Sequence, residues 1–251
     1  MADTAPATEP TEVVNEKPTL ETPVDEVKPV AADEAAAETA ETAEEEKEEV
    51  DENRIATVFD DAAHFTVKHP LRHKWTLWYT KPSQGGKTDW GDLLKEVVTF
   101  DSVEEFWGVY NNIPKASELP LKSDYHLFKS GVRPEWEDPQ NSKGGKWAYQ
   151  YRDKKNVNID DLWLNSLLGA IGETLEEDGD DEVMGCVATI RKAHYRISVW
   201  TRSADNQKVL VGIGRRFKEI LKLPHSEQVE FASHADAASN GSSRVKSRYT
   251  A

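Results

Sequence analysis

The chain has 251 residues and a formal net charge of −15, but the charge is unevenly distributed along it. Residues 1–53 hold 18 of the 46 acidic and 3 of the 31 basic residues, so the remainder carries 28 of each and is neutral. A neutral domain argues against a general single-stranded RNA binder, which needs a long basic track, and a single cysteine excludes a disulfide framework.

The composition divides the chain into three parts. Residues 1–58 combine high charge with few hydrophobic side chains, so we expect a disordered acidic tail that cannot offset the entropy of ordering. All eight tryptophans lie between Trp75 and Trp200, and we predict one compact domain over residues 59–235. Residues 236–251 are rich in serine, glycine and basic residues and are predicted to form a flexible tail.

The sequence also bears on the compartment. The first residues lack the basic region and the apolar run of a signal peptide, and no stretch approaches the ~20 apolar residues of a membrane helix. The lone cysteine fits a reducing compartment. We therefore expect a protein of the cytoplasm, with the nucleus as a second compartment and no membrane contact.

The first half of the domain alternates between strand and helix patterns. Aromatic and β-branched residues predict strands over residues 74–80 and 93–100. The segment DSVEEFWGVYNNIP has apolar residues at helical spacing, with Asp101 or Ser102 as the N-cap and Pro114 as the terminator. These residues therefore predict a helix between Ser102 and Pro114.

The second half repeats both patterns. Asn158 is predicted to cap a helix over residues 159–173, and a third helix is predicted over 206–223. Further strands are predicted at residues 125–131, 146–152, 183–191, 196–202 and 228–233. This order predicts an α+β domain, with one curved antiparallel sheet and helices packed on one face.

Two short motifs resemble a phosphate-binding loop and a metal site, but neither has the residues that such a site requires. The segment GGKT has Lys81 where a phosphate-binding loop requires glycine. His69 and His73 have the spacing of metal ligands on a helix, but Pro70 lies between them and no cysteine accompanies them. We see no Ser/His/Asp arrangement, and therefore expect no enzyme activity, no metal and no cofactor.

The tryptophans are more informative. Four of them have apolar neighbours on predicted strands or a helix and are assigned to the core: Trp75, Trp78, Trp147 and Trp163. Trp90 and Trp136 instead lie in predicted loops among glycine, proline, aspartate and lysine, where an indole has no evident core to join. Trp200 lies near a strand end, where burial and ligand contact are equally plausible.

Trp136 is followed directly by Glu137, which suggests a ligand that is both flat and cationic. Two loop indoles can sandwich a flat base, at roughly 1–3 kcal/mol for each stack, and a desolvated cation adds roughly 2 kcal/mol. Glu137 can accept two N–H donors from a guanine edge. A positively charged guanine satisfies both conditions, and the basic residues Lys146, Arg191, Lys192 and Arg196 could meet phosphates attached to it.

Seven sequence blocks resemble the eukaryotic translation initiation factor 4E family of messenger-RNA cap-binding proteins, and its fungal members most closely. The blocks are HPLRHKWTLWYTKP, SVEEFWGVY, SDYHLFKSGVRPEWED, KGGKW, LWLNSLLGAIGE, IRKAHYRISVWT and IGRRFKEILKL, which together span about residues 65–235. The resemblance implies a curved antiparallel sheet of about eight strands, with three α-helices on its convex face. It also implies a concave slot for the 7-methylguanosine 5′ cap and no catalysis.

The resemblance assigns roles to individual residues of the slot. Trp90 and Trp136 would stack on the base and Glu137 would accept its edge donors, while Trp200 would contact the methyl group. The phosphates would meet Arg191, Arg196 and Lys146, the last standing where animal members carry arginine.

The same resemblance implies a protein-binding face on the convex side. There a YxxxxLΦ helix of the scaffold subunit 4G, or of inhibitory 4E-binding proteins, would lie in an apolar groove. The groove would comprise His69, Pro70, Val103, Trp107, Leu164, Leu168 and Gly172. Asn165 replaces an acidic residue found in many relatives, which puts one charged contact in doubt. Ser242 or Ser243 lies near the regulatory phosphoserine of animal members.

The resulting hypothesis is a monomeric translation initiation factor that binds capped messenger RNA and recruits subunit 4G. The alternative is a translational repressor of the same fold that binds the cap without engaging 4G. Trp107 and the row formed by Leu164 and Leu168 favour the initiation factor. A cap-hydrolysing enzyme would need spaced metal-binding acids, which we do not find.

Overall fold

The computed structural model describes residues 56–57, 60–61, 64–83, 90–239 and 246–251. Except for residues 56–57, the predicted acidic tail lies outside the described residues, as do Ser242 and Ser243. The disorder of that tail and the role of the two serines therefore stay predictions. Among the described helices, none combines the length and the hydropathy that a membrane span requires.

An antiparallel sheet of eight strands forms the described domain, with the order β2-β1-β3-β5-β6-β4-β7-β8. Its strands are β1 (Pro70–Thr80), β2 (Leu94–Ser102), β3 (Asp124–Lys129), β4 (Gly145–Tyr151), β5 (Val183–Ile190), β6 (Tyr195–Thr201), β7 (Glu230–Ser233) and β8 (Tyr249–Thr250). The helices are α1 (Trp90–Leu93), α2 (Val103–Asn112), the 3-10 helix η1 (Ala116–Glu118), α3 (Ile159–Ile171), α4 (Gln207–Ile220) and α5 (His234–Ser239).

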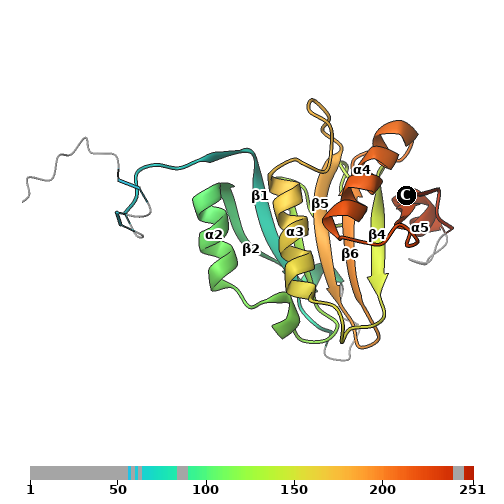
Figure 1. Ribbon diagram of the computed structural model, residues 1–251, viewed down its shortest axis with the longest axis horizontal. Helices are drawn as coiled ribbons and strands as arrows, with labels where there is room; N and C mark the ends of the chain where they lie inside the picture. Colours follow the sequence, from blue (N-terminus) through green and yellow to red (C-terminus); the bar gives the residue numbers. More distant parts are fainter. Residues whose placement is uncertain (1–55, 58–59, 62–63, 84–89, 240–245) are drawn as a thin grey trace, which may run out of the picture. The chain divides into compact units, whose positions relative to one another are not determined.

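Helices α2, α3 and α4 lie side by side across one face of the sheet (Figure 1). This arrangement confirms the predicted α+β class, the single antiparallel sheet and the three long helices. The two short helices α1 and α5 were not predicted.

Two predicted N-caps are present. The Ser102 hydroxyl accepts a hydrogen bond from the Glu105 backbone N–H, and the Asn158 side chain accepts from those of Asp160 and Asp161. Such caps satisfy N–H groups that have no partner within the helix. They explain why α2 and α3 begin where the sequence analysis expected.

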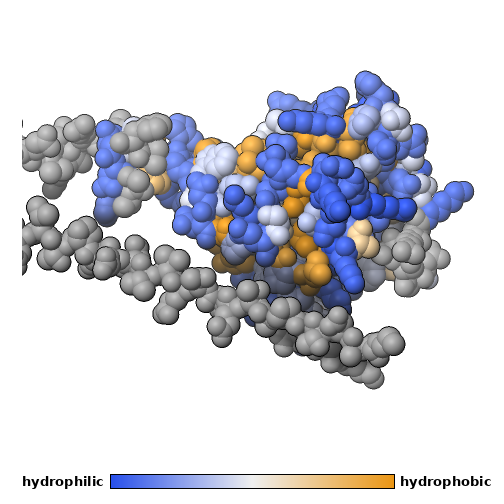
Figure 2. Space-filling model, turned by 60° about the horizontal axis from the view of Figure 1, so that its bottom comes forward, coloured by the Kyte–Doolittle hydropathy of each residue, from blue (hydrophilic) through white to orange (hydrophobic). Residues whose placement is uncertain are grey.

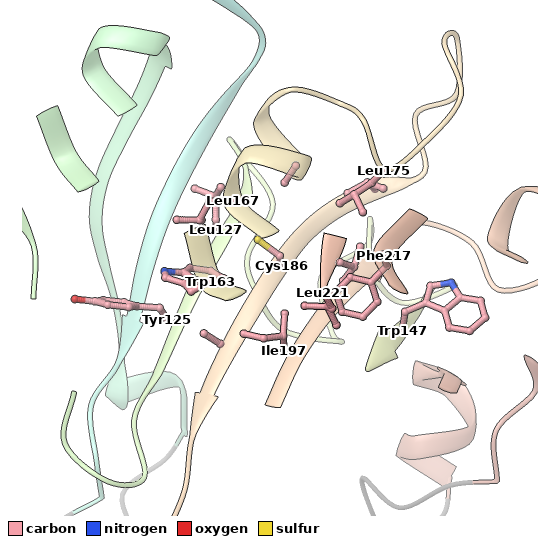
Figure 3. Close-up of a cluster of buried hydrophobic side chains, with 14 of the residues drawn as sticks. Tyr125, Leu127, Trp147, Trp163, Leu167, Leu175, Cys186, Ile197, Phe217 and Leu221 are labelled. Carbon is pink, nitrogen blue, oxygen red and sulfur yellow. The ribbon is translucent and has the colours of Figure 1, made fainter. Parts of the chain in front are cut away.

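The core lies between the sheet and the long helices (Figure 3). All four tryptophans assigned to the core are buried. Trp75, Trp147 and Trp163 lie in this cluster, whereas Trp78 lies opposite His126 in the register and therefore points to the other face of the sheet. Trp163 of α3 stacks on Tyr125 of β3, with 6.4 Å between ring centroids and 12° between planes. Cys186 lies in the same cluster, fully buried, and burial raises the pKa of its thiol.

Strand alternation places polar residues on the opposite face of the sheet. Tyr125 and Leu127 of β3 point into the core, so Asp124, His126 and Phe128 point away from the helices because successive side chains alternate. The register then sets Thr189 of β5 opposite Asp124. This face, opposite the three long helices, carries the candidate site.

Regular structure continues beyond residue 235, where the sequence analysis expected a flexible tail. Helix α5 follows β7 directly, and β8 pairs with β7, with Tyr249 opposite Phe231. Tyr249 also packs on the Phe231 ring, with 5.6 Å between centroids. Pairing between residues distant in sequence therefore holds the C-terminal residues, and composition alone does not reveal it.

The surface of the domain is mostly hydrophilic in the view of Figure 2, and hydrophobic residues gather in a narrower band across it. Among the described residues, the large hydrophobic side chains that are exposed are Trp90, Val97, Val103, Trp107, Leu121, Trp136 and Leu168. Five of these seven are residues that the sequence analysis assigned to ligand or partner binding. Their exposure therefore coincides with predicted function.

Candidate functional site

A hollow of about 350 Å³ lies on the face of the sheet opposite α2, α3 and α4. Its lining includes every residue predicted to hold the base or the phosphates: Trp90, Trp136, Glu137, Trp200, Lys146, Arg191 and Arg196. These residues come from α1, the β3–β4 connection, β4, β6 and the β5–β6 turn. We call this hollow the slot.

Trp90 is the first residue of α1 and not a loop residue as predicted. Its indole is 40 % exposed and meets the His126 ring edge-on, with 6.3 Å between centroids and 82° between planes. The Nε2 of His126 lies 2.7 Å from the Thr80 hydroxyl. Burial lowers the pKa of His126 to about 4, so this wall of the slot is neutral at physiological pH.

Trp136 and Glu137 project from the β3–β4 connection, which is held from within. The buried Asn141 side chain donates from Nδ2 to the backbone oxygens of Arg133 and Glu135, at 2.8 and 3.0 Å. The indole of Trp136 is 39 % exposed, and its Nε1–H donates to the Glu137 carboxylate. A rigid loop thus presents an accessible indole face beside a carboxylate.

Trp200 is half-buried between two rings. Phe128 meets it edge-on at 5.4 Å and His234 lies 4.1 Å away, both measured between centroids. The Nζ of Lys146 lies 5.9 Å from the Trp200 centroid. Burial, and next the nearby Lys146, lower the pKa of His234 to about 3. Trp200 is therefore fixed in place while still lining the slot.

The three cations of the slot differ in how they are held. Arg191 donates to the Asp124 carboxylate at 2.9 Å and to the Ser123 backbone oxygen at 3.0 Å, which fixes the guanidinium. Among the described residues, no carboxylate forms an ion pair with Lys146 or Arg196. A partly buried cation without a counter-ion is unfavourable, so these two side chains form a site prepared for an anion.

The pKa of Lys146 reflects the burial of this cation and its proximity to a second one. Burial first, and then repulsion by Arg196, lower its pKa to about 8, while Asp124 acts in the opposite direction. Burial likewise lowers the pKa of Arg196. An anion placed between these side chains would relieve both the desolvation and the repulsion.

Several residues of the slot escaped the sequence analysis: Asp124, His126, Thr189, Ser198 and His234. The alternation of Arg196, Ser198 and Trp200 along one strand was an available signal, because these three share a face. Lys192, which was considered for phosphate contact, does not line the slot. The described residues contain no group of three or more potential metal ligands.

The predicted partner-binding residues gather on the helix-bearing side. The His69 backbone oxygen accepts from the Val103 N–H at 3.0 Å, and the His69 imidazole contacts Glu104, whose pKa is lowered to about 2 mainly by hydrogen bonds from His69. Pro70 and Gly172 line a common hollow of about 570 Å³. The residue before β1 is therefore tied to α2, and the start of β1 approaches the end of α3.

The apolar members of this face remain accessible. Val103, Trp107 and Leu168 are each 36–37 % exposed, whereas Leu164 is half-buried. Trp107 packs edge-on against Phe106 and Tyr110, with centroids 5.0 and 5.9 Å away. The indole is thus oriented by α2 while part of it faces outward.

Comparisons with known proteins agree with this geometry. The family model described as "Eukaryotic initiation factor 4E" matches residues 70–249. Eukaryotic translation initiation factor 4E-1 of Schizosaccharomyces pombe is 52 % identical over 197 residues, which cover 78 % of this chain and 89 % of the relative. Eukaryotic translation initiation factor 4E of Saccharomyces cerevisiae is 52 % identical over 181 residues, which cover 72 % of this chain and 84 % of the relative.

Solved structures show the same fold. C. elegans eIF4E-3, in a complex with the 4E-binding protein Mextli and a cap analogue, has a TM-score of 0.66 at 36 % identity, over 74 % of this chain and all of that one. A schistosome eIF4E, complexed with m7GpppA and 4E-BP, has a TM-score of 0.67 at 30 % identity, over 73 % of this chain and 99 % of that one.

Proposed function

Because the chain belongs to the eukaryotic initiation factor 4E family, we propose that it binds the 7-methylguanosine 5′ cap of messenger RNA in the slot. Membership makes it a translation initiation factor and not an enzyme, as the sequence analysis expected. The observation that carries the proposal is the convergence on a single hollow of two accessible indoles, the Glu137 carboxylate and two cations that form no ion pair with a described residue.

Each part of the cap has a chemical counterpart in the slot. The methylated base is flat and cationic, which suits stacking between Trp90 and Trp136. The N–H donors on the edge of the base suit the Glu137 carboxylate. On binding, they replace the hydrogen bond that this carboxylate accepts from the Trp136 indole N–H. Trp200, fixed between Phe128 and His234, supplies apolar contact for the methyl group.

The triphosphate suits the cationic end of the slot. Arg196 and Lys146 form no ion pair within the described part of the chain, and Arg191, oriented by Asp124, retains guanidinium donors that no described residue uses. Charge-assisted hydrogen bonds to phosphate are about twice as strong as neutral ones. The cap-bound relatives from nematode and schistosome support this placement by their shared fold.

The helix-bearing face is proposed to bind a YxxxxLΦ helix, both of scaffold subunit 4G and of inhibitory 4E-binding proteins. Relatives solved with 4E-binding proteins support a protein-binding face in this fold. Recruitment of 4G by a monomer then joins the capped message to the initiation machinery. The exposed Trp107 and Leu168 favour this function over a cap-binding repressor that does not engage 4G.

Tryptophan fluorescence tests the slot. We expect both nucleotides to quench the tryptophan fluorescence of the wild-type protein, with a dissociation constant at least tenfold lower for 7-methyl-GTP than for GTP. The Trp136→Ala variant should lose this preference. The expected loss follows from one stack of roughly 1–3 kcal/mol together with its cation–π contribution.

Trp107→Ala is the matched control, because its indole is 36 % exposed against 39 % for Trp136 but lies outside the slot. It should retain the methyl-GTP preference. Equal binding of 7-methyl-GTP and GTP by the wild-type protein would refute the proposed function.

A further inference from the structure

The face of the sheet that carries the slot continues beyond it onto β1. Trp78 of β1 lies opposite His126 of β3 in the register, so both side chains point to this face, because directly opposed residues of an antiparallel pair share one side. Trp78 is 8 % exposed and, unlike His126, does not line the slot. Its indole is therefore a buried neighbour of the slot wall and not a part of it.

One cation stands over this indole. The guanidinium carbon of Arg133 lies 5.6 Å from the centroid of the Trp78 ring, which is within the distance of a cation–π contact. Arg133 belongs to the β3–β4 connection, three residues before Trp136, and it does not line the slot. The contact therefore joins the connection that carries Trp136 to a strand outside that connection.

The other polar groups of Arg133 are bound within the connection. Its Nε donates to the Glu135 carboxylate at 2.6 Å, and its backbone oxygen accepts from the Asn141 side chain at 2.8 Å. These two partners lie on either side of Trp136 in the sequence. A displacement of Arg133 from the Trp78 ring would therefore move the segment that presents the Trp136 indole.

The opposite indole of the slot is held at the same two strands. Trp90 meets the His126 ring edge-on, and the Thr80 hydroxyl of β1 in turn fixes His126. His126 and Trp78 are direct neighbours across the β1–β3 pair. Each stacking indole is therefore linked to one member of this neighbouring pair, and the register of the sheet fixes the separation of the two members.

We propose that Arg133 is a positioning residue, which holds Trp136 and Glu137 at the distance from Trp90 that one flat base requires. This inference rests on the cap-binding function proposed above, and it adds a residue that acts without touching the ligand. A sandwich that is already in place needs less ordering when the ligand binds. A connection that is in place for only part of the time lowers the measured affinity by that fraction.

The exposed Arg133 can be replaced without opening the core. For Arg133→Gln, we expect the dissociation constant of 7-methyl-GTP to rise about two- to fivefold, as for a connection that is in place for about a half to a fifth of the time. Stopped-flow tryptophan fluorescence should show this loss in the association rate. The dissociation rate should stay unchanged, because the bound slot keeps all of its contacts with the ligand.

The nucleoside 7-methylguanosine separates positioning from simple electrostatics. It is a cation without phosphates, so the removal of a nearby positive charge would by itself leave its binding unchanged or strengthen it. Positioning predicts the opposite sign. Arg133→Gln should weaken the binding of 7-methylguanosine by the same factor as that of 7-methyl-GTP.

Trp78→Leu tests the other partner of the contact, because it removes the aromatic face and keeps a large apolar side chain. It should also weaken the binding of 7-methyl-GTP. The double variant with Arg133→Gln should bind no more weakly than the weaker single variant, since both substitutions remove one shared contact. Urea denaturation checks that each variant is folded under the conditions of the binding assay.

Lys143→Gln is the matched control. Lys143 is an exposed cation of the same β3–β4 connection, and it does not line the slot. This variant should bind both ligands as the wild-type protein does. A loss equal to that of Arg133→Gln would overturn the inference, because it would show a general effect of charge on this connection.

Three further results would overturn the inference. One is unchanged or tighter binding of 7-methylguanosine by Arg133→Gln, and another is a loss that lies in the dissociation rate, which would place Arg133 in contact with the ligand. The third is full additivity of Arg133→Gln and Trp78→Leu, which would show that the two residues act separately. Failure of the wild-type protein to prefer 7-methyl-GTP over GTP would instead reject the proposed function.

Discussion

The depressed pKa of Lys146 predicts a pH dependence of triphosphate binding. Burial and Arg196 hold this pKa at about 8 in the free protein, and a bound phosphate raises it again because the anion favours the ammonium form. Binding therefore takes up a proton above pH 8. Affinity is full below that pH and falls as pH rises through it.

The magnitude follows from the fraction of protonated lysine. With a free-protein pKa of about 8 and a higher value in the complex, the affinity should fall about tenfold between pH 7 and pH 9. Isothermal titration with 7-methyl-GTP at several pH values measures this fall. Titration with 7-methylguanosine, which has no phosphates, corrects for ionisation of the base itself.

Lys146→Arg provides the control for this prediction. A guanidinium stays charged across the whole range, so the ratio of triphosphate to nucleoside affinity should become independent of pH. The reasoning is refuted if that ratio is already flat in the wild-type protein, or if the arginine variant retains the same slope.

Two further predictions concern the fold and the partner face. A Cβ at Gly214 of α4 would lie 2.7 Å from the Trp147 ring, whereas at Gly212 the nearest atom is the mobile Nη1 of Arg216 at 3.2 Å. In urea denaturation, Gly214→Ala should lower the free energy of unfolding by about 1–3 kcal/mol. Gly212→Ala should leave it unchanged or raise it by up to ~1 kcal/mol. Equal effects of the two substitutions would contradict this packing. Trp107→Ala should weaken the binding of a YxxxxLΦ peptide, measured by fluorescence anisotropy, by about 2 kcal/mol or more. Leu121→Ala should not, although Leu121 is the more exposed of the two residues. Unchanged peptide affinity in Trp107→Ala would show that this indole does not belong to the partner face.

Local patterns predicted the long elements well. Helices α2 and α3 begin directly after Ser102 and Asn158 because the side chains of these two residues cap the first turn, which is a property of adjacent residues. The elements that were not predicted are too short to show a local sequence pattern. Helix α1 has only four residues, and β8 consists of two residues whose order depends on pairing with β7.

In the slot, too, residues with a local sequence signal were predicted and residues that depend on the folded sheet were not. Trp136 and Glu137 stood out because an indole beside a carboxylate in a glycine-rich loop has no structural explanation of its own. Asp124 and His126 did not, because polar residues on a strand are ordinary until the register is known. Asp124 is 67 residues away from the arginine that it orients, so only the folded sheet reveals the pair.

The partner face, by contrast, could be assigned only through the resemblance. Val103 and Trp107 lie at helical spacing, and such residues equally suit a core. Their 36–37 % exposure is a tertiary property, since it depends on where α2 lies relative to β1 and α3. Periodicity predicts which side of a helix is apolar but not whether a neighbouring helix covers that side.

The position of Cys186 makes the folded protein unreactive toward thiol reagents. It is the single cysteine of the sequence, it has no exposed surface and its thiol pKa is raised by burial, so neither access nor thiolate is available. Alkylation then proceeds only through molecules whose sheet has opened, and its rate reports that rare population. A cysteine introduced at the surface would conversely be the one site that accepts a dye, without any native residue having to be removed first.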